Sequence, residues 1–122
     1  MEPWGGGQIT PRAHCVLAPN PGPMTLDGTN TWILLEPGAS EAIVIDPGPL
    51  DERHLQEVCR VVAESGATRI HLVAHSMGNR ALTEALELFA LKHAGAPPAF
   101  DQVLFTAPDL DAGLFAKMVE TI

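Results

Sequence analysis

The stretch "IHLVAHSMGNRAL", residues 70 to 82, decides how this chain folds because it has the pattern of a strand, a tight turn and a helix. The apolar run "IHLVA" leads into a histidine, a serine and a glycine, and an amphipathic pattern begins directly afterwards. We expect a helix from about residue 77 to residue 93, because its apolar residues recur at helical spacing. Ser76 then lies where a strand turns into a helix, and it is the first candidate nucleophile of the chain.

The segments around this stretch alternate between strands and helices. The runs "TNTWILLE" (29–36) and "EAIVIDPG" (41–48), joined by "PGAS", predict an antiparallel hairpin. A helix should follow, with Asp51 as its N-cap and with its end at Ser65 and Gly66. The apolar face of that helix is predicted to consist of Leu55, Val58, Cys59 and Val62. Further short strands are expected at 14–18, 70–74 and 102–107, and a last helix at 114–122.

From residue 42 onward the order is strand, helix, strand, helix, strand, helix, which is typical of a parallel sheet covered by helices with right-handed crossovers. We therefore predict the α/β class: a three-layer α/β/α-like domain with a mixed sheet, in which an N-terminal antiparallel hairpin precedes a parallel β-α-β-α-β-α unit. The 122 residues, 46% of them hydrophobic, suffice for one such domain at 12–122. Residues 1–11 contain "WGGG" and "TPR" and are predicted to form a flexible N-terminal arm.

Charge and composition exclude several classes of partner. The net charge of -8, from 15 acidic and 7 basic residues, leaves no basic patch for nucleic acid or for an anionic membrane. No apolar run approaches the roughly 20 residues of a membrane span, and the first residues lack a signal-peptide pattern, so a cytoplasmic location is expected. Cys15 and Cys59 have no C-x-x-C spacing and are interpreted as reduced, small hydrophobic residues.

The turn at Ser76 has the spacing of a nucleophile elbow. Such a turn needs small residues on both sides of the serine, and Ala74 and Gly78 occupy those positions. The start of a helix brings backbone N–H groups and the positive end of the helix dipole to the serine, so the N–H of Met77 is predicted to be one oxyanion-hole donor. His75, the direct neighbour of Ser76, completes the set of candidate catalytic residues.

The same residues resemble a known family. The segments "IHLVAHSMGNRAL" and "FDQVLFTAPDLDAGLF" (100–115) are similar to a group of largely uncharacterised bacterial α/β-hydrolases, and the resemblance covers about residues 67–122. It implies that Ser76 is the nucleophile of an elbow and that 102–107 is the next strand. Members of this fold carry their catalytic acid and histidine after later strands, in the order Ser, Asp or Glu, His. We expect both to be missing here.

A serine needs a base within about 2.6–3.2 Å to become a nucleophile. The chain offers five histidines, of which His75 would have to fold back on its own backbone and His71 is expected to be a structural, half-buried residue of a sheet face. The other three are His93, at the far end of the predicted helix, and His14 and His54, which only an unforeseen fold would bring near. Asp109 and Asp111 are interpreted as residues of an N-cap and turn rather than as triad acids, and Arg80 as a solvated or carboxylate-paired residue.

The first half resembles a different family. "CVLAPNPGPMTLDGTNTWILLEPG" followed by "AIVIDPGPLDERHLQEV" is similar to the N-terminal part of metallo-β-lactamase-fold hydrolases, and this resemblance covers about residues 12–66. It implies an H-x-H-x-D-H motif for two metal ions, generally zinc. The motif would begin at His75, but Met77, Asn79 and Arg80 stand at the other three ligand positions, so no metal site and no cofactor are expected. Asp46 resembles an acid near that metal site, yet we expect it to cap the turn before the helix.

These resemblances predict a chimera, with a metallo-β-lactamase-like front at 12–66 and an α/β-hydrolase-like back at 67–122. Three functions remain open. The favoured one is a non-catalytic, hydrolase-derived domain with an incomplete active site; the second is a serine hydrolase that uses Ser76; the third and least favoured is a metal-dependent hydrolase. The substrate is unknown. The strand at 102–107 is expected to leave an exposed sheet edge through which the chain can self-associate.

Overall fold

A computed structural model describes residues 3–49, 51–75 and 102–106, together with Leu86, Gly95, Gly113, Ala116, Lys117 and Glu120. These residues contain one six-stranded sheet and a 13-residue helix. The elements are β1 (Gly7–Thr10), β2 (Ala13–Leu17), β3 (Asn30–Leu34), β4 (Glu41–Ile45), α1 (Glu52–Glu64), β5 (Arg69–His75) and β6 (Gln102–Thr106).

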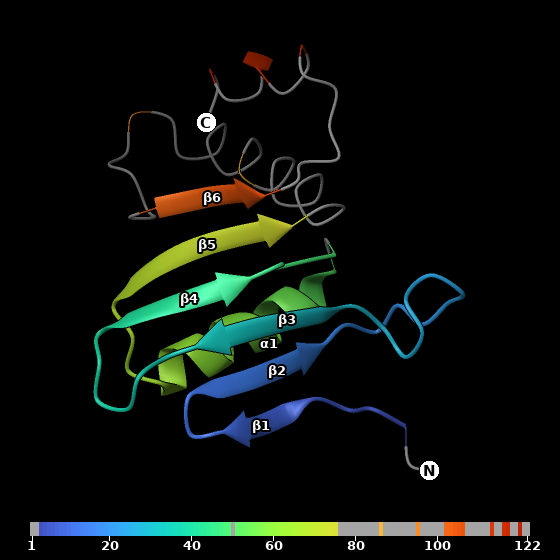
Figure 1. The fold of residues 1–122 in the computed structure, drawn as a ribbon, viewed down its shortest axis with the longest axis horizontal. Coiled ribbons are helices and arrows are strands. Elements are labelled where there is room, and N and C mark those ends of the chain that lie inside the picture. Colours follow the sequence, from blue (N-terminus) through green and yellow to red (C-terminus); the bar gives the residue numbers. More distant parts are fainter. Residues whose placement is uncertain are drawn as a thin grey trace.

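The sheet is mixed, and its strands lie side by side in sequence order from β1 to β6 (Figure 1). The four strands β1 to β4 pair antiparallel, whereas β4, β5 and β6 run parallel. The connection from β4 to β5 passes through α1, as a parallel pair requires. The predicted α/β class, the mixed sheet, the hairpin of β3 with β4 and the parallel strands after it are confirmed.

Helix α1 begins where the sequence indicated. The Asp51 carboxylate accepts a hydrogen bond of 2.9 Å from the backbone N–H of His54, and Ser65 is the C-cap. Its buried residues differ from the predicted face: Cys59 is exposed, and His54 and Val61 are buried with Val58 and Val62. These four buried residues follow one another at intervals of four, three and one positions. They form a stripe along the helix that lies next to the apolar face predicted from the sequence.

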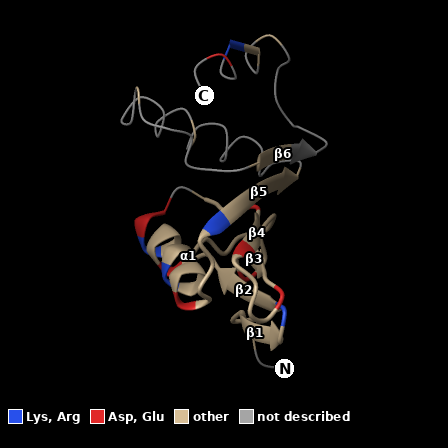
Figure 2. Ribbon diagram, turned by 90° about the vertical axis from the view of Figure 1, so that its left-hand side faces the viewer, with Lys and Arg blue, Asp and Glu red and all other residues tan. Residues whose placement is uncertain are grey.

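The core lies between α1 and one face of the sheet (Figure 2). Alternate residues of β3, β4 and β5 point toward the helix, because side chains on a strand alternate between the two faces. The buried members of this core are Val16, Ile33, Val44, Val58, Val61, Val62, Leu72, Ala74 and Leu86. Leu86 is helical and belongs to the predicted helix at 77–93, whose other residues lie outside the described part of the chain. Of the helices in the described residues, none is long and apolar enough to cross a membrane.

The sequence predicts a flexible arm at 1–11, but part of this segment, residues 4–10, contacts the rest of the sheet. Trp4 donates from Nε1 to Asn30 Oδ1 at 2.7 Å, and its ring lies 6.4 Å from that of Trp32. Strand β1 then pairs with β2, with Gly7 opposite Cys15. The partners of Trp4 are more than 20 residues away in the sequence, so the local Gly-rich pattern could not indicate these contacts.

The close approach of Gly6 to β2 gives a test of this docking. Gly6 has φ +73°, and a Cβ there would lie 2.6 Å from the Cys15 carbonyl oxygen, whereas Gly38 has φ +82° and open space around it. Gly38→Ala should cost about 1 kcal/mol through backbone strain alone. Gly6→Ala should cost more, and β1 should separate from β2, because a backbone carbonyl cannot move aside easily.

Amide hydrogen exchange of β1 and thermal unfolding measure both effects. Gly6→Ala is expected to accelerate exchange in residues 7–10, and Gly38→Ala to leave it unchanged. Equal exchange of β1 in the two variants would contradict the docking of this segment on β2.

Candidate active site

Strand β5 brings the chain to the candidate nucleophile. It lies between β4 and β6, its Ala74 is fully buried, and it ends at His75, the residue before Ser76. His75 is exposed, and its backbone N–H donates to Asp46 Oδ1 at 2.8 Å. The small residue predicted before the serine therefore has a packing reason, because a larger side chain at Ala74 would enter the core beneath α1.

Several predicted site residues lie outside the described part of the chain. They are Ser76, Met77, Gly78, Asn79, Arg80, His93, Asp109 and Asp111. The roles expected for Ser76 and Met77 therefore remain predictions. Of the three candidate catalytic residues, His75 is the one that the structure describes.

Asp46 occupies a special position at the end of β4. Its φ of +52° is left-handed, a conformation that Asp tolerates better than most residues. Its N–H donates to the Val73 carbonyl at 2.8 Å, and its own carbonyl accepts from Thr31 Oγ1 and from the Gly48 N–H, each at 2.8 Å. The expectation that Asp46 caps the turn before the helix was wrong, because its carboxylate accepts from the His75 N–H on β5. Asp51 caps α1, as predicted.

Behind Asp46 lies a buried polar pair, Thr31 and His54. Thr31 is fully buried and His54 is 2% exposed, and Thr31 Oγ1 lies 2.8 Å from His54 Nε2. Because the single hydroxyl proton of Thr31 goes to the Asp46 carbonyl, His54 must donate from Nε2. Its Nδ1 is buried without a hydrogen-bond partner among the described residues.

Protonation of His54 would add a donor at that unpartnered nitrogen. Burial accordingly lowers the pKa of His54 below 6.5. The negative charge of Asp51 and the polar backbone groups of Leu17 and Gly48 raise this pKa, but by less than burial lowers it. His54 is therefore a neutral structural histidine of the core. The sequence analysis did not predict this role. The one signal for it is the position of His54 four residues before Val58, in the buried stripe of the helix.

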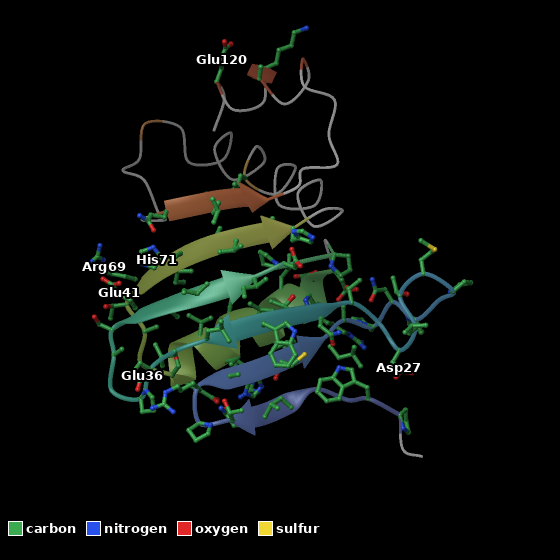
Figure 3. All side chains as sticks on the ribbon, viewed as in Figure 1. Asp27, Glu36, Glu41, Arg69, His71 and Glu120 are labelled. Atoms are coloured by element: carbon green, nitrogen blue, oxygen red, sulfur yellow. The ribbon has the colours of Figure 1, made fainter. Side chains whose placement is uncertain are left out.

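The remaining described histidines lie far from the carboxyl end of β5. His71 is four residues before His75, about 13 Å along the strand, and its Nε2 is 3.3 Å from Glu41 Oε2. Figure 3 shows this pair beside Arg69, which also binds Glu41. His14 is on β2, three strands or about 14 Å across the sheet from β5, and its Nδ1 contacts Gln8 Oε1 at 3.1 Å.

A groove of about 840 Å³ opens along β3 to β6, and its lining includes Ile43, His71 and Leu104. These side chains alternate with the core residues, so the groove lies on the sheet face opposite α1. In the described part of the chain, no three His, Cys, Asp or Glu side chains gather into a group that could hold a metal ion.

The lowered pKa of His54 has a consequence for stability. As the pH falls below about 6.5, the unfolded chain takes up a proton on this histidine before the folded chain does, so the free energy of unfolding should decrease. Urea unfolding between pH 7.5 and pH 5 measures the effect. His54→Gln keeps an N–H donor but no titrating ring, and its unfolding energy should decrease less over this range; an identical pH dependence in both proteins would contradict the assignment.

Comparison with curated proteins gives no match. A family model does match: it is described as an alpha/beta hydrolase of unknown function (DUF900), and it covers residues 50–122, more than half of the chain. The match begins at residue 50, before α1, and so includes the helix, β5, β6 and Ser76, where the sequence predicts a turn. By this match the chain belongs to the α/β-hydrolase family DUF900.

Proposed function

We propose that this chain is a hydrolase-derived domain that carries the nucleophile strand of a serine hydrolase but does not catalyse hydrolysis by itself. Family membership and the position of β5 support the first half of the proposal, because β5 ends at the residue before Ser76. The second half rests on where the histidines lie.

The placement of the described histidines is the observation that carries the proposal. His14 and His71 lie more than 10 Å from the carboxyl end of β5, by strand geometry. His54 starts near that end, but its Nε2 is engaged with Thr31 and its ring is buried. Each of these three side chains is committed to a structural contact, so none of them supplies a base for Ser76.

We also propose that the chain joins two sources, a metallo-β-lactamase-like front at 12–66 and the α/β-hydrolase back, within a single domain that comprises residues 12–122 and the paired strand β1. The resemblance of the front and its antiparallel strands β2 to β4 support the first source. Residues 51–74 fit both sources, since a helix followed by a central strand occurs in each. The two free thiols, Cys15 and Cys59, are compatible with the reducing conditions of the cytoplasm, the location that we propose.

Labelling with a fluorophosphonate tests the proposal. The folded chain is incubated with the probe beside Ser76→Ala, and mass spectrometry locates any adduct. We expect no stoichiometric adduct at Ser76, because a serine hydroxyl without a base is a weak nucleophile. Circular dichroism of the same sample confirms that it is folded.

A serine hydrolase with its own base is the second candidate, favoured by membership in a hydrolase family. Stoichiometric labelling that Ser76→Ala abolishes would overturn the first proposal and establish this one. His75→Ala and His93→Ala would then identify the base, with His71→Ala as a control that should leave the labelling unchanged.

We further propose that two copies of the chain associate through β6. Among the described strands, β6 forms one edge of the sheet, and its Leu104 is 55% exposed. An edge strand presents unpaired N–H and carbonyl groups that can pair with a second chain, and lysine on such a strand opposes the pairing.

Sedimentation velocity over a range of concentrations tests this association. The wild-type chain should form dimers, and Leu104→Lys should shift it to monomers. Ile43→Lys is the matched control, since Ile43 is 40% exposed on the same face but lies on the inner strand β4. A wild-type monomer at all concentrations, or equal effects of both substitutions, would refute pairing through β6.

A further inference from the structure

The last hydrogen bond between β4 and β5 differs from the others of this parallel pair, because its acceptor is a side chain. Ile45 lies opposite Val73, and the Asp46 N–H donates to the Val73 carbonyl, as in a regular parallel ladder. The next bond of such a ladder would join the His75 N–H to the Asp46 carbonyl. In this protein that carbonyl is turned away and accepts from Thr31 and Gly48 instead.

The left-handed conformation of Asp46 explains the change. With φ at +52°, the backbone leaves the direction of the strand, and its carbonyl points to the β3 side and to the following turn. The carboxylate then takes the place that the carbonyl has left, and Oδ1 accepts from the His75 N–H at 2.8 Å. A side chain thus completes a backbone ladder.

We propose that Asp46 is a positioning residue for the backbone that leads into Ser76: its carboxylate replaces the backbone carbonyl as the last acceptor of the β4–β5 ladder and fixes the backbone at His75. Ile45, the last residue of β4, lies opposite Val73, so β5 continues two residues beyond the end of β4 and reaches His75, the residue before the serine. The importance of this position rests on the proposed function, but the hydrogen bond itself does not.

Two variants separate the acceptor from the backbone conformation. Asp46→Gly keeps the left-handed φ and removes the acceptor, whereas Asp46→Asn keeps both, because asparagine tolerates this conformation and has a side-chain oxygen. Amide hydrogen exchange by NMR reads out the His75 N–H, and the Ile33 amide of β3 is the reference for general loosening.

Asp46→Gly should accelerate exchange of the His75 amide by about tenfold or more relative to Ile33, as the loss of a hydrogen bond to a charged group predicts. It should also shift the amide resonance of Ser76. Asp46→Asn should restore most of the protection and a Ser76 resonance near that of the wild type. Equal protection of His75 in wild type and Asp46→Gly would overturn the proposal.

The wild-type protein allows a direct measurement if Asp46→Gly does not fold. A scalar coupling through the hydrogen bond, between the His75 amide nitrogen and the Asp46 side-chain carbon Cγ, is expected. A coupling to the Asp46 backbone carbonyl carbon, or no coupling at all, would refute the assignment. Neither experiment depends on labelling of Ser76, so the positioning role and the proposed function can fail separately.

Discussion

The parallel pairing of β4 with β5 is the constraint on which the rest of the described structure depends. Because parallel neighbours need a crossover, the chain between them forms α1, and α1 must then lie on one face of the sheet. The face on which α1 lies determines which residues of each strand are buried: Ile33, Val44 and Leu72 face the helix. The parallel pairing also places the ends of β4 and β5 side by side, so that Asp46 lies beside His75, the residue before Ser76.

The two buried polar residues of the described part of the chain, Thr31 and His54, lie at this same end. Thr31 links the carbonyl of Asp46 to the ring of His54, so β3, β4 and α1 meet in one hydrogen-bonded group. An unpaired polar group costs more in a low-dielectric core than at the surface, so the three partners fix one another in one arrangement. The Asp51 carboxylate caps the same end of the helix by accepting a hydrogen bond from the His54 N–H. The start of α1 and the end of β4 are therefore held as a unit.

Local sequence patterns predicted much of this fold but little of its polar centre. Alternation and turn residues located β3, β4, β5 and β6, and Asp51 was identified as the N-cap, because these features depend on neighbours within a few residues. Strand β1 was missed because "GQIT" is hardly apolar and does not show the alternation of a half-buried strand, although its partner β2 follows within a few residues. The role of Asp46 was missed for a different reason: its acceptor function depends on a left-handed backbone and on a partner 29 residues away.

The polarity of the sheet determines what the candidate site can do. In a parallel unit the carboxyl ends of the strands form one edge, and a group that acts on Ser76 must reach that edge. His71 sits on β5 itself but at its amino end, where it pairs with Glu41. His54 lies near the carboxyl end of β5. To act as a base, its side chain would have to break the hydrogen bond with Thr31 and move out of its buried position. Apart from His75, His54 is the described histidine that the topology brings close to the carboxyl end of β5. Its hydrogen bond with Thr31, which also binds the Asp46 carbonyl at the end of β4, prevents it from acting as a base for Ser76.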